Sequence, residues 1–215
     1  TFPWDKPWRG QVLVHRDRDG RPDGYVRYTA EERWEAHHPR GSIAVQVLIA
    51  LADRAYANLW RFLGEVDLVG IVKAERRRVR ERLPWLLRNA RAATPSEISD
   101  GIHVLLLDVA RVLAARAYEL ADRLVLEVAA PPASPELGGR FVLDATPHGA
   151  TCRPTTATPD LTLPLAALGA VVLGGGRLRW AVDAYGGVDE YAAGALDRAE
   201  RLFRSRDDPW CTTFF

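Results

Sequence analysis

The sequence predicts an α+β protein of two domains, and three observations support this. Short β-type runs alternate with segments whose apolar residues recur at helical spacing. A polar stretch at 92–101, rich in turn and cap residues, divides the chain into two parts. The hydrophobic fraction of 47% and the charged fraction of 27% are those of globular domains with a buried core. We expect one domain over residues 1–100 and a second over 101–215.

The first part predicts an aromatic loop, a hairpin and then strands and helices. Prolines beside Trp4 and Trp8 disfavour a helix or a central strand over residues 1–9. Polar turn residues separate the β-type runs 11–15 and 24–28, which indicates a hairpin. The remaining expected elements are a strand at 42–49, a helix at 52–63, a strand at 66–72, and a helix at 79–89 that Pro84 interrupts or restarts.

The second part predicts a mixture of helices and strands. Asp108 is a good N-cap for a helix over 109–120. Pro164 suits the first turn of a helix that ends at the glycines 174–176. The other expected elements are strands at 124–128, 140–145, 150–153 and 160–163, helices at 164–173, 177–184 and 191–204, and an extended tail at 210–215.

Charge and composition exclude several classes of partner. A net charge of +1 gives no broad field for a nucleic-acid backbone, so we expect no nucleic acid. The basic run of residues 76–82 is interleaved with glutamates, and we interpret it as a solvated helix face rather than a phosphate patch. Two cysteines in no metal or disulfide pattern predict the reduced cytoplasm and no metal. No apolar run is long enough to span a membrane, so no membrane is expected.

The usual catalytic patterns are missing from the sequence. It has no Gly-x-Ser-x-Gly elbow, and Cys211 lies in no signature with a histidine, so we interpret it as a packed thiol. His37 and His38 are adjacent and diverge, which favours a surface loop over a metal site. The motif Arg/Gln-x-x-Gly-x-Gly/Ala, whose backbone N–H groups hold a pyrophosphate, does not occur. An acyl-CoA enzyme would use a motif of this kind to hold the pyrophosphate of acetyl-CoA, so the sequence has no visible site for acetyl-CoA.

Several motifs occur in an order that resembles the C-terminal part of Eis-type GNAT N-acetyltransferases. The first part carries Pro-Asp-Gly-Tyr-Val-Arg-Tyr at 22–28, Leu-Trp-Arg-Phe-Leu at 59–63 and Asp-Leu-Val at 67–69. Further matching stretches are 103–118, Leu-Val-Leu-Glu-Val at 124–128, Pro-Asp-Leu-Thr-Leu at 159–163, Leu-Gly-Ala at 168–170, Leu-Gly-Gly at 173–175, and the final Phe214-Phe215.

The resemblance implies an incomplete GNAT-like domain at 1–100 and a sterol-carrier-protein-like domain at 101–215. It implies transfer of an acetyl group from acetyl-CoA, as co-substrate, to a primary amine such as an aminoglycoside or a polyamine. The acetyl-CoA-binding domain would be missing from this chain, which should be inactive alone. Because members of this family form symmetric oligomers, the resemblance also implies that this chain forms a homo-oligomer. Two alternatives stay open, a lipid-carrier module and a scaffold for assembly without catalysis.

The resemblance also assigns the tail a role. It implies that the terminal carboxylate, here that of Phe215, is the general base, with Phe214 beside it in the substrate site. Trp210 and Phe214 would supply apolar surroundings that strengthen this base. The alternative is that the two phenylalanines only fill a core. The family's acid tyrosine cannot be assigned to any of Tyr25, Tyr28, Tyr56, Tyr118, Tyr185 and Tyr191.

Overall fold

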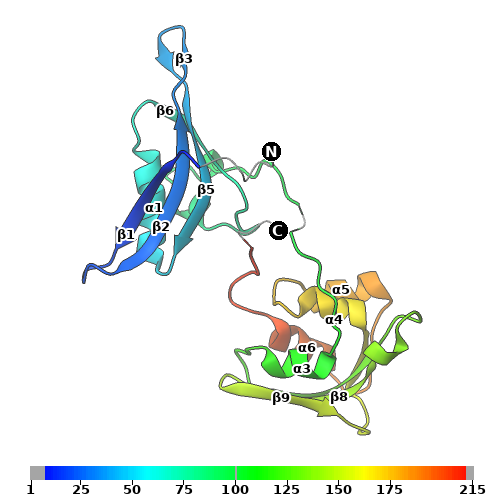
Figure 1. Cartoon of the computed structure of the whole chain (residues 1–215). Helices are drawn as coiled ribbons and strands as arrows, with labels where there is room; N and C mark the ends of the chain where they lie inside the picture. The colour runs from blue at the N-terminus through cyan, green and yellow to red at the C-terminus, as the bar shows by residue number, and fades with distance from the viewer. Residues whose placement is uncertain (1–7, 100, 212–215) are drawn as a thin grey trace. The chain divides into compact units, whose positions relative to one another are not determined.

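A computed structural model describes residues 8–99 and 101–211 of the chain (Figure 1). These residues fall into two compact units. Unit 1 consists of residues 8–99 together with 210–211, and unit 2 of residues 101–209. The chain is mixed α+β, as the sequence predicts.

Unit 1 is built on a four-stranded sheet in the order β1-β2-β5-β6. Strands β1 and β2 form the predicted antiparallel hairpin, and β2 also pairs antiparallel with β5. Strand β6 joins β5 in parallel after the crossover through α1. The elements are β1 (Gln11–Arg16), β2 (Pro22–Glu31), β3 (Trp34–Glu35), β4 (His38–Pro39), β5 (Gly41–Ala50), α1 (Asp53–Gly64), β6 (Val69–Ala74), α2 (Leu83–Leu86) and the 3₁₀ turn η2 (Ala90–Ala92).

Helix α1 packs on one face of this sheet. The helical spacing predicted Ala52, Ala55, Tyr56, Leu59 and Leu63 as one face. The last four are buried, together with Trp60, whereas Ala52 is exposed and precedes the first residue of the helix. They meet apolar residues of the central strands β2 and β5, namely Val26, Tyr28, Ile43, Val45 and Leu48. The core of unit 1 therefore lies between α1 and the sheet.

The segment after β6 differs from the prediction. The expected helix over 79–89 is reduced to the four residues of α2, and residues 75–82 form an irregular loop. Pro84 lies in the first turn of α2, where its missing N–H costs no helical hydrogen bond. A longer helix through Pro84 would lose that bond and clash with the preceding turn. The interpretation of the arginine run as a helix face is therefore wrong.

Unit 2 has a five-stranded sheet in the order β11-β10-β7-β8-β9. Neighbouring strands are antiparallel except β10 and β7, which are parallel. Its helices gather on one face of the sheet (Figure 1). The elements are α3 (Val109–Ala115), β7 (Asp122–Ala129), the 3₁₀ turn η3 (Pro135–Leu137), β8 (Gly139–Thr146), β9 (Gly149–Pro154), β10 (Leu161–Pro164), α4 (Leu165–Val171), α5 (Leu178–Tyr185), β11 (Asp189–Glu190) and α6 (Ala195–Phe203).

Helix α3 begins where the sequence predicts and ends early. The Asp108 side chain accepts a hydrogen bond of 2.9 Å from the Arg111 backbone N–H, which confirms the N-cap. The helix stops after Ala115 rather than at residue 120, because Arg116 is extended, with ψ of 142°. That conformation directs the chain toward β7.

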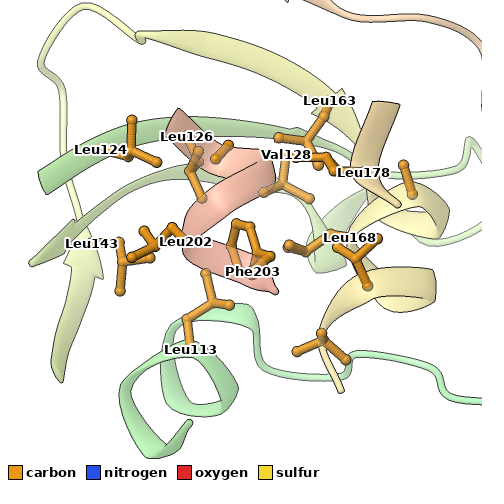
Figure 2. Packing of buried hydrophobic residues seen from close by; sticks show 14 of the residues in the cluster. Leu113, Leu124, Leu126, Val128, Leu143, Leu163, Leu168, Leu178, Leu202 and Phe203 are labelled. Carbon is orange, nitrogen blue, oxygen red and sulfur yellow. The ribbon is translucent and has the colours of Figure 1, made fainter. Parts of the chain in front are cut away.

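The core of unit 2 is centred on Phe203. Its side chain is 1% exposed and lies among leucines of strands and helices, as Figure 2 shows. Alternate residues of β7 face it, as period-2 burial requires. The surrounding buried residues include Leu113, Leu124, Leu126, Leu143, Leu163, Leu168, Leu178 and Leu202. The predicted apolar face of the last helix is confirmed by the burial of Ala195, Ala199, Leu202 and Phe203.

Candidate functional site

The residues that the sequence singles out for catalysis and substrate binding, Phe215 and Phe214, lie outside the described residues. The described part of the tail is Trp210 and Cys211, and both belong to unit 1. The domain division at residue 100 stays a prediction. What the structure adds is the surface of unit 1 that the beginning of the tail contacts.

Trp210 contacts the loop of residues 75–82. Its indole Nε1–H donates a hydrogen bond of 2.5 Å to the backbone carbonyl of Arg76. The guanidinium of Arg77 lies 5.0 Å from the indole ring centroid, and that of Arg78 lies 5.4 Å from it. Both distances are within the range of cation–π attraction. We call Trp210, Arg76, Arg77 and Arg78 the tail clasp.

Within the tail clasp, Arg77 is held on several sides. Its Nε donates to Glu81 at 3.0 Å, and its Nη1 donates to the carbonyl of Leu48 in β5 at 3.0 Å. The same guanidinium lies 5.8 Å from the ring centroid of Trp60 in α1. Its side chain is only 14% exposed. Contacts with the sheet and with α1 therefore hold the Arg77 guanidinium in place over the Trp210 ring.

Glu81 links the loop to Tyr56 of α1. The Tyr56 hydroxyl donates to one oxygen of Glu81 while Arg77 occupies the other. Burial, and then the hydrogen bond to Glu81, raise the pKa of the Tyr56 phenol. Tyr56 thus stays protonated and serves to order the loop. Burial also raises the pKa of Tyr118 to about 12, and its hydroxyl donates to the carbonyl of Leu113.

A second polar group in unit 1 involves His15, Asp23 and Asn58. Asn58 Nδ2 lies 2.9 Å from His15 Nε2, and His15 Nδ1 lies 2.5 Å from Asp23 Oδ1. With the Asn58 amide as donor, Nε2 accepts and Nδ1–H donates to the carboxylate. Both ring nitrogens are then engaged in joining β1, β2 and α1. No pattern in the sequence indicates this group, because its members come from three separate elements.

The other sequence candidates lie apart from the tail clasp. His37 and His38 are exposed at the β3–β4 turn, as the surface interpretation expected. Burial, and then the charges of Asp108 and Asp144, raise the pKa of the Cys152 thiol to about 11. Gly174 has a φ of +90°, and a Cβ there would lie 2.1 Å from Ser205 Oγ. This glycine is required by close chain packing after α4, in agreement with its predicted role in ending the helix.

Across 8–99 and 101–211, no group of three or more His, Cys, Asp or Glu side chains is placed to hold a metal ion. Among the helices of those same ranges, none combines the length and apolar character that crossing a bilayer requires.

Unit 2 bears on the lipid-carrier alternative. The Phe203 side chain occupies the space between the sheet and the helices (Figure 2). A hollow of about 220 Å³ lies near the first residue of β7 and is lined by Leu120, Ala121, Asp122, Arg198, Arg201 and Leu202. Ligand pockets usually enclose about 300–1,000 Å³ and are mostly apolar. This hollow is smaller and contains an Asp–Arg ion pair.

Family models match both parts of the chain. The model for an acetyltransferase (GNAT) domain matches residues 3–112, and the model for a sterol carrier protein domain matches residues 109–212. Together they cover almost the whole sequence, in the order that the motifs predicted.

Relatives and solved structures agree with these models. An N-acetyltransferase of Streptomyces griseus is 37% identical over 213 residues, which are 99% of this chain and 50% of the relative. The N-acetyltransferase Eis of Mycobacterium tuberculosis is 31% identical over 163 residues, 73% of this chain and 36% of the relative. The crystal structure of Eis1 from Mycobacterium abscessus matches 99% of this chain and 52% of its own, with a TM-score of 0.81 and 32% identity. The chain thus spans about half the length of the first of these relatives. It belongs to the Eis-type family of GNAT N-acetyltransferases.

Proposed function

We propose that this chain is the C-terminal portion of an N-acetyltransferase that moves an acetyl group from acetyl-CoA to a primary amine of an aminoglycoside or polyamine type. The match of residues 3–112 to the GNAT domain model carries this proposal. The acetyl-CoA-binding domain belongs, in this proposal, to the half of the protein that precedes Thr1. We also propose that the protein is located in the cytoplasm and forms a homo-oligomer.

The general base in this proposal is the carboxylate of Phe215, with Phe214 lining the amine site. The amine nitrogen attacks the acetyl carbonyl carbon, an N–H proton passes to the carboxylate, the C–S bond of the thioester breaks, and CoA leaves as a thiolate that a general acid outside this chain protonates. A general base of this kind contributes roughly 10²- to 10⁴-fold to a rate. The attachment of Trp210 to unit 1 supports the assignment, because it brings the start of the tail to the GNAT-like part of the chain.

The test compares semisynthetic full-length proteins that differ at one atom group. A ligated C-terminal peptide ends in the Phe215 carboxylate in one protein and in the Phe215 amide in the other. We expect the amide to lower kcat by about 10²-fold or more, because only the proton acceptor is removed. Release of the CoA thiol with a panel of amines is the measurement. Equal rates for amide and carboxylate would refute the general-base role.

The 215-residue chain alone is expected to release no thiol from acetyl-CoA above the uncatalysed rate. The sequence lacks the Arg/Gln-x-x-Gly-x-Gly/Ala loop, and residues 75–82 form an arginine-rich loop rather than a glycine-rich one. The full-length protein in the same assay is the positive control. Activity of the isolated chain would place an acetyl-CoA site within it and contradict the proposed division of labour.

A further inference from the structure

We propose that the hairpin of β3 and β4 is an arm through which two copies of this chain associate, by pairing the outer edges of their β3 strands about a two-fold axis. The inference rests on the homo-oligomer of the proposed function, since it names the surface that joins the copies. We call residues 32–40 the arm. The arm projects beyond the ends of β2 and β5, as Figure 1 shows.

The arm has little support from the rest of unit 1. Its two strands form a sheet of their own, and every residue of the arm is exposed. A two-stranded hairpin is marginally stable by itself in water. The turn residues Ala36 and His37 have φ of +46° and +67°, in the left-handed region, although neither is a glycine. Such a conformation persists where further contacts support it, and a second copy would supply them.

The two outer edges of the arm differ in what they offer to another strand. Trp34 pairs with Pro39, and the Arg40 N–H donates to the Arg33 carbonyl at 2.7 Å. Because proline has no N–H, Trp34 and Pro39 are a pair of the antiparallel ladder that exchanges no hydrogen bonds. The backbone N–H and C=O of Trp34 therefore point away from β4. The outer edge of β3 offers a donor and an acceptor at this position, whereas Pro39 offers no donor on the outer edge of β4.

The sequence Arg33-Trp34-Glu35 is complementary to itself in an antiparallel pair. A two-fold axis at Trp34 places the two copies of this residue opposite each other, and each Trp34 N–H then donates to the carbonyl of the other. The same register places Arg33 of one protomer opposite Glu35 of its partner, on both sides of the axis. The two indole rings, each 52% exposed in a single copy, lie together on the other face of the pair.

The charges of the arm favour a second copy over a nucleic acid or an anionic membrane. Residues 32–40 contain two glutamates and two arginines, so their charges balance. Glu32 and Glu35 would repel an anionic partner, whereas a second copy presents both signs. The indole N–H of Trp34 donates to Glu32 at 2.8 Å, which orients the ring before association. A tryptophan at the centre of a contact, with charged pairs around it, has the composition of a binding hot spot.

The first experiment measures self-association of the 215-residue chain by sedimentation velocity over a range of concentrations. We expect the wild type to associate, and Trp34→Ala to raise the dissociation constant about tenfold or more, because it removes the central aromatic pair. The matched control is Trp85→Ala, whose ring is 90% exposed in α2 of the same unit, and it should associate like the wild type. A wild type that stays monomeric, or a Trp34→Ala protein that associates as tightly, would overturn the inference.

The second experiment reverses one charge at a time. Arg33→Glu makes positions 33 and 35 both acidic, and Glu35→Arg makes both basic, so each variant should associate with itself about tenfold more weakly. An equimolar mixture of the two should recover the wild-type affinity, because each acidic residue then faces a basic one across the contact. The ion pair of Arg33 and Glu35 within one chain, at 2.6 Å, is lost in both variants, so recovery on mixing reports contact between copies alone. A mixture that associates as weakly as its components would refute the pairing.

These measurements separate the arm from the proposed function. If the wild type and the arm variants associate equally, the homo-oligomer stands and the arm is not its interface. If the wild type does not associate, the homo-oligomer and the arm fail together, whatever the rate of acetyl transfer by the full-length protein. Loss of association in Trp34→Ala with recovery in the charge mixture supports the arm, and this result is independent of the assay on the Phe215 amide.

Discussion

At the scale of single residues, arginines in this protein bind carbonyl oxygens and aromatic rings as well as carboxylates. Arg77 bonds the carbonyl of Leu48, and Arg198 bonds that of Arg123. A guanidinium has five donors and a flat face, so one side chain satisfies several partners. A nearly neutral charge balance therefore does not reveal which arginines are solvated. Arg77, which the sequence analysis placed on a solvated face, is only 14% exposed and bonds Glu81 and the Leu48 carbonyl.

The ion pair of Asp122 and Arg198 gives a prediction about pH. Arg198 donates to both Asp122 oxygens, at 3.1 and 2.5 Å, joining β7 to α6. This hydrogen bonding holds the pKa of Asp122 below its usual value. A carboxyl with a depressed folded pKa stabilises the protein above its unfolded pKa, about 3.9, and loses that contribution as pH falls through the folded pKa.

We therefore expect Asp122→Asn to lower the free energy of unfolding at pH 7 by about 1 kcal/mol, since the pair is partly exposed. Once the pH falls below the depressed folded pKa of Asp122, the variant and the wild type should converge, because the wild-type carboxyl is then protonated as well. Urea unfolding across this range is the measurement. Asp144→Asn is the control, since its pair with Arg123 is longer, at 3.5 Å, and more exposed. A deficit that persists unchanged at low pH would contradict the assignment.

At the scale of elements, Arg116 joins the ends of two helices. Its Nε donates to Val172 at the end of α4, and its two Nη groups donate to Leu202 and Phe203 at the end of α6, all within 2.6–3.1 Å. The last carbonyls of a helix have no partner within the helix, so these bonds satisfy groups that would otherwise be unpaired. Burial lowers the pKa of Arg116, which nonetheless stays charged.

Removing this charge should destabilise unit 2 strongly. Arg116→Met keeps much of the side-chain volume and leaves three carbonyls without their donor, so we expect a loss of about 2–4 kcal/mol in the free energy of unfolding. Arg116→Lys keeps the charge and should recover part of it, because an ammonium cannot reach three carbonyls in a fork. Chemical denaturation of the three proteins gives the comparison. A change under about 0.5 kcal/mol in Arg116→Met would show that water replaces the guanidinium.

The sequence predicted the elements well where local rules decide them. The hairpin of β1 and β2, the buried face of α1, the Asp108 cap and the Phe203 face of α6 all follow from period, turn chemistry or capping. The prediction was wrong where tertiary contacts decide. Helix α3 ends earlier than predicted, next to Arg116, which binds carbonyls at the ends of two other helices. The two-residue strands β3, β4 and β11 are too short to show a hydrophobic period in the sequence.

The candidate site was less predictable than the fold. The motifs and the family resemblance pointed to Phe215, but nothing local to Trp210 indicates its partners, which are 132–134 positions earlier in the chain. The contact with Arg76 also depends on a backbone carbonyl whose direction no side-chain pattern records. Sites of this kind depend on long-range contacts between segments, and they become visible only in the folded chain.

At the scale of the whole molecule, the two units have separate cores. Among the residues that the structure describes, twenty-five buried residues form the cluster of unit 2, and all of them lie within 106–203. In the described part of unit 1, the nine buried residues of the other cluster all lie within 26–63. A segment with its own hydrophobic core is able to fold by itself.

We therefore expect residues 101–209, expressed alone, to fold with a single cooperative thermal transition. Phe203→Ala in this fragment should lower the free energy of unfolding by about 3–5 kcal/mol, because it opens a cavity at the centre of the core. The same substitution in the 215-residue chain should lower the stability of unit 2 by a similar amount, whereas Leu59→Ala, in α1, should act on unit 1 alone. Calorimetry, with circular dichroism of each variant, measures both effects. A fragment without a cooperative transition would mean that the buried residues of unit 2 are not sufficient to fold it, and that its core depends on residues outside 101–209.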